Sequence, residues 1–337
     1  MTMLALNLVI CWEGLKRSIS RKLFAEFSCF NSTLRENNTL NLENIDCESN
    51  IKLNRILRGH TLDTTNISSY LAGLIEGEGC IYVPKITVGA ATVSIIFNSK
   101  DLPLPLLIQK ELRIGNIYKV KGKNAYSYTI SNIEGLIKIT NLINGYMRTP
   151  KINKLYELID WINLKNKKII ISEKFSIDNS CLSINAWLSG FIDADGCFYV
   201  RVTRNKNCTT NKVACLFELA QKTTDKNSML EIITKISEFL STRACLSSGS
   251  VKFRKKSNQL WIRTSNYESN KILVLYLNKY SLFSSKYLDF LSWQTILNIM
   301  IKKEQVNKLE VIRNIKNNMN SKRTHFAWDH LQNFYSY

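Results

Sequence analysis

The sequence predicts an α+β protein built from two related halves. Two segments, residues 68–83 and 185–200, are similar along their whole length without a gap. Each begins with apolar residues at helical spacing and continues into the alternating pattern of a strand. Similarity of this kind within one chain indicates a repeated structural unit. The length of 337 residues also suits two domains.

The two segments agree in their glycines and acids as well as in their apolar residues. Acidic residues are aligned at Glu76 with Asp193 and at Glu78 with Asp195. The identical pairs are Leu71/Leu188, Gly73/Gly190, Ile75/Ile192, Gly79/Gly196, Cys80/Cys197, Tyr82/Tyr199 and Val83/Val200. We therefore expect a first repeat over residues 66–166, a linker over 167–180 and a second repeat with a C-terminal helical region over 181–335. Residues 1–60 lack the pattern and are interpreted as an N-terminal extension.

Each half is predicted to run helix, two strands, helix, two strands, helix. Residues 117–122 and 126–131 flank a short turn and predict a hairpin. Residues 251–256 and 259–264 are its counterpart in the second half. A looser similarity near the end of each half aligns Lys154 with Lys286.

The charge indicates a polyanionic partner. Lys and Arg number 46 against 27 Asp and Glu, which gives a net charge of +19. Nucleic acid is the commonest partner of so basic a chain. A protein of the membrane surface is the competing class, but no long apolar amphipathic stretch dominates the sequence, and no transmembrane helix is expected. The nine cysteines form no CxxC pair and there are three histidines, so we do not expect a structural zinc site.

The repeated motif predicts two helices that pack closely. On a helix, Gly73 and Gly77 share one face, as do Gly190 and Ala194 in the second motif. Small residues let two helix backbones approach each other. Side-by-side packing would bring the two helix ends together, and with them the last acid of each motif.

Two carboxylates at one place favour a metal site. Glu78 and Asp195 would repel each other, and a divalent cation relieves that repulsion. Hard oxygen ligands suit Mg²⁺, or Mn²⁺ in its place. We therefore expect Glu78 and Asp195 to bind the metal and to carry phosphodiester hydrolysis. Glu76 and Asp193 are expected to accept hydrogen bonds from nearby backbone groups.

The segments LAGLIEGEG (71–79) and LSGFIDADG (188–196) resemble the two signature motifs of the LAGLIDADG homing endonuclease family. The resemblance is to double-motif, single-chain members encoded by organellar group I introns, and it covers about residues 66–335. It implies two αββαββα repeats whose saddle-shaped antiparallel sheets straddle double-stranded DNA. It also implies Mg²⁺ shared by Glu78 and Asp195. The expected activity of such a monomer is cleavage of both strands at one long site, leaving 3′ overhangs.

The resemblance extends to other site residues. Family members often place a Gln ahead of a Lys after the second strand, which Gln221–Lys222 matches and Ser99–Lys100 does not. A basic residue near the later helix corresponds to Lys286 in the second half. In the first half it is Lys151 or Lys154, and both remain open as the catalytic residue, although the alignment above places Lys154 opposite Lys286.

A sheet that binds DNA should carry basic and polar residues on one face. Arginines would read guanine edges in the major groove, and lysines would mostly contact phosphates. Strand alternation would place Lys119, Lys121 and Lys123 in one row. The predicted DNA contacts are Lys85, Thr87, Lys119, Lys121, Lys123, Arg201, Thr203, Arg204, Lys252, Arg254 and Arg263.

Two other functions are compatible with these features. A maturase that assists splicing of its own group I intron RNA would use the same basic surface, alone or beside nuclease activity. A DNA-binding protein without activity is favoured only by the departure at Ser99. Abundant Ile, Asn and Lys with only 4 Pro suggest an A+T-rich organellar gene. We therefore expect a mitochondrial protein, with the chloroplast as the alternative.

Overall fold

The computed structural model describes residues 65–85, 89–165, 171, 173–204, 211–224, 228–241 and 251–337. All of them belong to one compact unit of the chain, residues 50–337. The whole of the predicted N-terminal extension, residues 1–60, lies outside the described residues, and so does Thr87, a predicted DNA contact. Within the described ranges, no helix is both long and apolar enough to span a bilayer.

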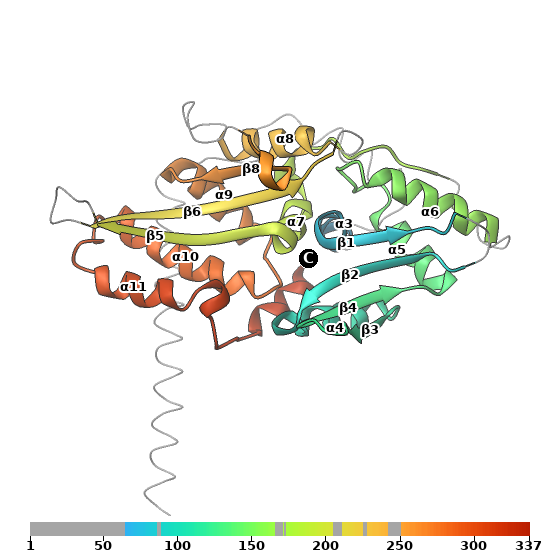
Figure 1. The fold of residues 1–337 in the computed structure, drawn as a ribbon, viewed down its shortest axis with the longest axis horizontal. Coiled ribbons are helices and arrows are strands. Elements are labelled where there is room, and N and C mark those ends of the chain that lie inside the picture. The colour runs from blue at the N-terminus through green and yellow to red at the C-terminus, as the bar shows by residue number, and fades with distance from the viewer. Residues whose placement is uncertain are drawn as a thin grey trace, which may run out of the picture. The chain divides into compact units, whose positions relative to one another are not determined.

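The first half contains one antiparallel sheet with strand order β1-β2-β4-β3 (Figure 1). A short 3₁₀ turn, η2 (Ser99–Asp101), follows the second strand. The elements are α3 (Thr65–Glu78), β1 (Gly79–Tyr82), β2 (Thr92–Asn98), α4 (Pro103–Leu112), β3 (Asn116–Lys119), β4 (Ala125–Ile130), α5 (Ile133–Ile143) and α6 (Ile152–Lys165).

The second half repeats this arrangement, with strand order β5-β6-β8-β7. Its elements are α7 (Trp187–Asp195), β5 (Gly196–Arg204), β6 (Asn211–Lys222), α8 (Leu230–Ser241), β7 (Lys252–Arg254), β8 (Gln259–Thr264), α9 (Tyr267–Lys279), α10 (Lys286–Ile301) and α11 (Leu309–Asn317), with 3₁₀ turns η3 (Leu182–Ile184), η4 (Lys255–Ser257), η5 (Asn320–Lys322) and η6 (Asp329–Ser336). The predicted αββαββα order is confirmed in both halves, and each half continues into a further helix, α6 or α10.

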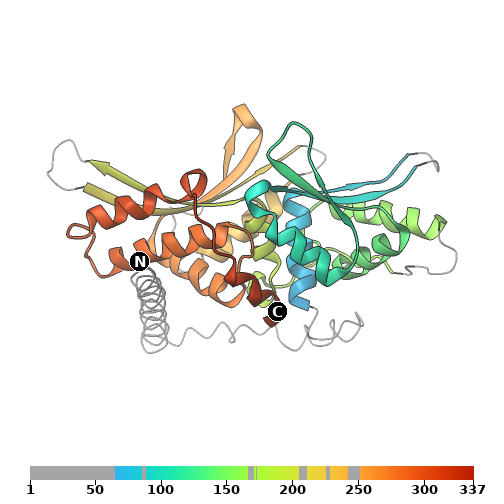
Figure 2. The same cartoon turned by 90° about the horizontal axis from the view of Figure 1, so that it is seen from below.

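Each sheet has one face covered by helices and one open face. Along β5, Phe198 and Val200 are buried, whereas Arg201 and Thr203 are exposed. Successive strand residues point to opposite faces, so the apolar set packs on the helices and the polar set faces away from them. Figure 2 shows the helices gathered on one side of both sheets.

The two motif helices, α3 and α7, lie side by side between the sheets (Figure 1). A Cβ at Gly73 would lie 2.0 Å from the carbonyl oxygen of Trp187, and one at Gly190 would lie 2.0 Å from that of Tyr70. A Cβ at Gly77 would lie 2.2 Å from Cβ of Ala194. Backbone therefore contacts backbone where the sequence predicted small residues on facing helix surfaces.

The first acid of each motif links the two helices. Trp187 Nε1 of α7 donates to Glu76 at 2.6 Å, and the Tyr70 hydroxyl of α3 donates to Asp193 at 2.8 Å. These two bonds are equivalent under the repeat, because Tyr70 and Trp187 occupy the same motif position. The backbone nitrogens that also donate are those of Arg148 and Thr149 to Glu76, and of Phe283 and Ser284 to Asp193. This is the structural role that the sequence predicted for Glu76 and Asp193.

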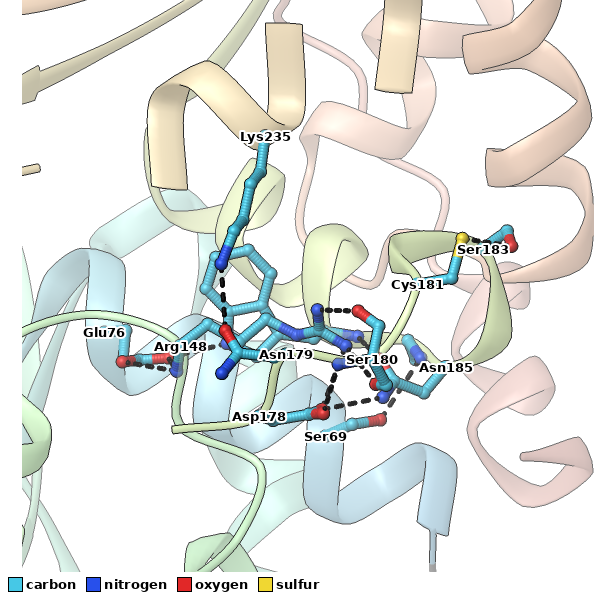
Figure 3. Close-up of polar contacts among 12 residues, drawn as sticks. Ser69, Glu76, Arg148, Asp178, Asn179, Ser180, Cys181, Ser183, Asn185 and Lys235 are labelled. Carbon is cyan, nitrogen blue, oxygen red and sulfur yellow. Dashed lines mark hydrogen bonds and ion pairs between the residues drawn. The ribbon is translucent and has the colours of Figure 1, made fainter. Parts of the chain in front are cut away.

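A buried ion pair fastens the linker to the first half (Figure 3). Arg148 Nη2 lies 2.9 Å from Asp178 Oδ2, and their side chains are 2% and 3% exposed. The same guanidinium donates to the Ser180 hydroxyl at 2.8 Å. Because the backbone nitrogen of Arg148 also bonds to Glu76, the linker and α3 are held by one residue.

Replacing Asp178 should destabilise the protein strongly. The Asp178→Ala variant would leave the Arg148 charge buried without its partner, which costs about 3 kcal/mol in the free energy of unfolding. Asp160→Ala is the matched control, because Asp160 pairs with Lys174 at 2.6 Å with its side chain 64% exposed. That pair should contribute less than about 1 kcal/mol. Urea unfolding measures both, and equal losses would contradict the role given to Asp178.

Candidate active site and exposed sheet faces

The last acid of each motif is also the last residue of its helix. Glu78 ends α3 and Asp195 ends α7. A Cβ at Gly77, next to Glu78, would lie 2.9 Å from Asp195 Oδ2. Desolvation and the charge of Asp195 raise the pKa of Glu78, and burial raises the pKa of Asp195. The helix pairing thus places two carboxylates close together at a point where both are costly to ionise.

Gln221 lies at the end of β6 and contacts the second acid directly. Its Nε2 donates to Oδ2 of Asp195. This bond stabilises the charged carboxylate and opposes the rise in the pKa of Asp195 caused by burial. The bond also fixes the orientation of that carboxylate. Because the amide donates to Oδ2 alone, Oδ1 can bind another ligand.

The first half has a different residue at the position of Gln221. Ser99 N donates to Asn124 O at 3.0 Å, and Thr223 N donates to Asn258 O at 3.0 Å, so Ser99 corresponds to Thr223. Two residues earlier, buried Phe97 therefore stands where Gln221 stands. The alignment that set Ser99–Lys100 opposite Gln221–Lys222 is therefore displaced by two residues. The two acids consequently differ in their surroundings, with an amide beside Asp195 and an aromatic ring in its place in the first half.

Of the two lysines left open for the first half, the structure places Lys151 at the helix end and Lys154 away from it. Lys286 Nζ donates to the carbonyl oxygens of Ile192 and Ala194 at 3.2 and 2.6 Å, at the end of α7. Lys151 Nζ makes the same kind of contact at the end of α3, with oxygens of Ile75, Glu76 and Gly79 at 2.7–2.8 Å. Lys154 instead forms an ion pair with Glu157 at 2.6 Å, and its side chain is 54% exposed.

Both lysines place positive charge beside both acids. Burial lowers the pKa of Lys151 and of Lys286, and the charges of Glu78 and Asp195 act in the opposite direction on each. Each ammonium also offsets the partial negative charge of a helix C-terminus, where a carboxylate by itself is unfavourable. Lys151 and Lys286 therefore make two acids tolerable at two adjacent helix ends.

One contact of the site crosses between the halves and was not predicted. Buried Asp101, in η2 of the first half, accepts a hydrogen bond from Ser285 N at 2.7 Å, next to Lys286. The residue before Lys151 is Pro150, whose nitrogen carries no hydrogen, so this contact has no symmetric counterpart. A sequence pattern gives no signal for such a pair, because it forms only when the halves meet. A cavity of about 370 Å³ is lined by residues of both halves, among them Glu78, Phe97, Asp101 and Lys286.

The chemistry of these donors suits a hard divalent cation. In the described part of the chain, no group of three or more His, Cys, Asp or Glu side chains is placed to hold a metal. Two close carboxylates suit Mg²⁺, which keeps several waters and takes its remaining ligands from substrate phosphates. Glu78 and Asp195 fit that requirement better than they fit zinc, which favours nitrogen and sulfur ligands.

The open face of the second sheet carries four of the predicted basic residues. In β5, Cys197, Arg201 and Thr203 point to this face. Residues paired across neighbouring strands share a face, so Glu218, which pairs with Cys197, and Arg263 of β8, which pairs with Glu218, lie on it too. Lys252 and Arg254 of β7 lie on the same face, opposite Trp261 and Gln259 of β8. Arg204 is exposed at the end of β5, where alternation turns it to the other side of the strand.

The lysines predicted on the first sheet do not form a row. Lys119 pairs with Tyr126, on the face of β4 that also carries buried Tyr128, and its Nζ lies 4.5 Å from the Tyr126 ring. Lys121 and Lys123 lie in the turn after β3, so strand alternation does not apply to them. Lys85 is exposed just beyond β1. The open face here is uncharged, because alternation brings Ser94, Ser127, Thr129 and Tyr118 to it.

Comparison with known proteins gives consistent results. The family model described as LAGLIDADG endonuclease matches residues 71–163 and 188–297. The chain is 31% identical to the intron-encoded DNA endonuclease aI3 of Saccharomyces cerevisiae, over 86% of this chain and 79% of that protein. It is 28% identical to an uncharacterised cox1 intron-2 protein of Schizosaccharomyces pombe, over 67% of this chain and 63% of that one. A shorter match, 28% identical over 38% of this chain and 18% of the other, is the intron-encoded RNA maturase bI4 of S. cerevisiae.

A solved structure has the same fold. The I-LtrWI LAGLIDADG homing endonuclease, determined bound to its target DNA, aligns with a TM-score of 0.58 and 22% identity, covering 77% of this chain and all of that one. The family model matches both motif regions together with the strands and helices that follow them. The chain therefore belongs to the LAGLIDADG endonuclease family.

Proposed function

We propose that this protein is a site-specific homing endonuclease that cuts both strands of a long double-stranded DNA site and leaves 3′ overhangs. The observation that carries the proposal is the meeting of Glu78 and Asp195 at the adjacent ends of α3 and α7. A carboxylate at a helix C-terminus is unfavourable, because it lies at the negative end of the helix dipole. Here the cost occurs twice at equivalent positions, and each acid has a lysine beside it.

The metal we propose is Mg²⁺, with Mn²⁺ as the substitute. When bound, it would supply Lewis-acid catalysis at the phosphodiester and lower the pKa of an attacking water. The protein's own contribution is to hold two carboxylate charges in place at the helix ends. Gln221 orients Asp195 through Oδ2, and the charges of Lys151 and Lys286 oppose the rise in the pKa of both acids and add positive charge at the site.

Lys151 and Lys154, the two lysines considered for the first half, give a direct test of the role proposed for Lys151. Lys151→Met should lower the cleavage rate about 100-fold, because groups that orient metal ligands typically contribute about 10–100-fold. Lys154→Met removes the same charge from the exposed pair with Glu157 and should change the rate less than about twofold. Single-turnover cleavage of a labelled duplex measures both. A larger loss for Lys154→Met would return the role to that residue.

The setting we propose is a mitochondrial group I intron. The support is the abundance of Ile, Asn and Lys, which suggests an A+T-rich gene, together with two relatives whose names place them in introns, one of them in cox1. Maturase activity on the intron RNA is a second candidate, favoured by the short match to a maturase. It would add to the nuclease, because both acids and both lysines are present here.

The experiment that tests the function is cleavage of a randomised DNA library by purified protein with and without Mg²⁺. The double variant Glu78→Gln/Asp195→Asn is the control. We expect wild type alone, with the metal, to enrich one cut site with 3′ overhangs. DNA binding without cleavage would overturn the nuclease, and a splicing assay on the intron RNA would then test the maturase.

A further inference from the structure

We propose that the open face of the second sheet contains a guanine-reading site in which Glu218 holds Arg254 and Arg263 in position, and that the first sheet lacks it. This inference rests on the proposed function, because it assumes that the sheets bind DNA. It adds to that function a requirement for guanine in one half of the target site.

Glu218 contacts both arginines on the open face. In β6 it pairs across the sheet with Arg263 of β8, and Arg254 comes from β7 beyond it. Its Oε2 accepts from Arg263 Nη2 at 2.6 Å and from Nε at 3.1 Å, and its Oε1 accepts from Arg254 Nη2. One carboxylate therefore fixes two guanidinium groups.

Aromatic rings restrict the same two arginines. The guanidinium carbons of Arg254 and Arg263 each lie 4.6 Å from the centroid of the Trp261 ring. Lys252 Nζ lies 5.4 Å from that ring, and Arg263 is 5.8 Å from the ring of Tyr199. Stacking on an aromatic face and pairing with a carboxylate both fix the plane of a guanidinium group. Little side-chain entropy is then left to lose when DNA binds.

The geometry leaves each arginine able to donate. In Arg263, Glu218 occupies the edge formed by Nε and Nη2, so Nη1 and the second hydrogen of Nη2 remain for another acceptor. The arginine side chains are 30% and 38% exposed, against 16% for Glu218. Two parallel donors on a guanidinium match O6 and N7 of guanine, the most frequent specific contact in the major groove.

Charge favours DNA at this face despite the carboxylate. Burial alone would raise the pKa of Glu218, but the two arginines hold it below its ordinary value, so Glu218 is ionised. One negative charge against Arg254, Arg263 and Lys252 leaves the cluster positive. The carboxylate therefore restrains the arginines while the face still attracts phosphates.

The first sheet has no equivalent of this cluster. The repeat places Ser94 where Glu218 stands, Thr129 where Arg263 stands and Ser127 where Trp261 stands, as the strand pairings show. Ser127 and Thr129 hydroxyls lie 3.0 Å apart. Hydroxyls accept and donate to any base edge, so they discriminate less than a fixed guanidinium. The two half-sites should therefore differ, with the guanine requirement in one of them.

The test is selection of bound sequences from randomised double-stranded DNA in buffer containing EDTA, so that binding is separated from cleavage. For wild type we expect guanine at one or two positions of a single half-site, bound about 10-fold more tightly than adenine there. Arg263→Lys keeps the charge and loses the paired donors. It should reduce that preference to less than about threefold while the affinity for random DNA stays nearly unchanged.

Glu218→Gln separates the orienting role from a purely structural one. It should lower the guanine preference and raise the affinity for random DNA, because a negative charge is removed while the arginines become mobile. Arg313→Lys is the matched control, because Arg313 also pairs with a carboxylate, that of Glu310 at 3.5 Å, but lies on α11 and not on the open face of a sheet. It should leave the preference at the guanine positions intact.

Two results would overturn the inference. One is a selected site without guanine in either half. The other is an equal loss of affinity for guanine and adenine sites in Arg263→Lys, which would make the arginine a phosphate contact. Guanine selection by a protein that never cuts would sink the proposed function alone. Cleavage at a site without guanine would sink this inference alone.

Discussion

Glu78→Gln and Asp195→Asn, made singly, should each lower double-strand cleavage on the order of 10³-fold. Loss of groups that only orient metal ligands costs about 10–100-fold, and loss of a ligand itself should exceed that. Each substitution keeps the shape of the side chain and removes one charge of the pair. Affinity for DNA should stay the same or rise, because less negative charge faces the phosphates. Single-turnover cleavage and equilibrium binding measure the two effects.

A matched control is available on the same helices. Glu76→Gln alters the first acid of the motif, which is buried and bonded to Trp187 and to backbone nitrogens. It should lower stability, and where the variant folds it should retain most of its cleavage rate. If Glu76→Gln removed cleavage at unchanged stability and Glu78→Gln did not, the assignment of the two acids would be reversed.

The same acids should also make stability fall as pH rises. The folded-state pKa values of Glu78 and Asp195 lie above their ordinary values, so the folded protein retains protons that the unfolded chain releases. The free energy of unfolding therefore decreases as pH rises from the ordinary carboxyl range, about 4, through the raised values. Glu78→Gln removes the part of this dependence that Glu78 contributes, and Asp195 retains its own part. Urea unfolding should show the variant more stable than wild type at pH 7 and equal to it below about pH 4, and a constant difference would contradict the account.

The sequence was sufficient to predict the features that the repeat encodes locally. The acids, glycines and strand alternation recur in register, so the pairing of α3 with α7 and the meeting of Glu78 with Asp195 follow from helix geometry alone. The roles of Gln221 and Lys286 remain predictions, and the structure places both beside the acids. These contacts use residues close to a motif or to a strand end, where the alignment has fixed points.

The errors arose where a shift of a few residues preserves the pattern. Aligning Lys154 with Lys286 was wrong by three residues, which is nearly one helical turn and leaves the apolar spacing almost intact. Placing Ser99 at Gln221 was wrong by two, which keeps every strand residue on its own face. The row of Lys119, Lys121 and Lys123 failed because β3 ends at Lys119. Asp101 and Ser285 could not be paired from sequence, since only the packed halves bring them together.

Gly73→Ala and Gly190→Ala should each destabilise the protein by about 5 kcal/mol, because the added methyl group would lie 2.0 Å from a backbone oxygen of the partner helix. Overpacking against side chains typically costs about 1–3 kcal/mol. Here the obstacle is backbone, so α3 and α7 must separate, and the bonds from Tyr70 and Trp187 would be lost with the contact. Gly122→Ala is the control: its Cβ would meet nothing within 4 Å, and its φ of 71° predicts a cost of only about 1 kcal/mol. Thermal and urea unfolding compare the three variants. Losses at Gly73 and Gly190 no larger than at Gly122 would mean that the helices can move apart freely, and a site that needs Glu78 and Asp195 at a fixed separation would then have no rigid support.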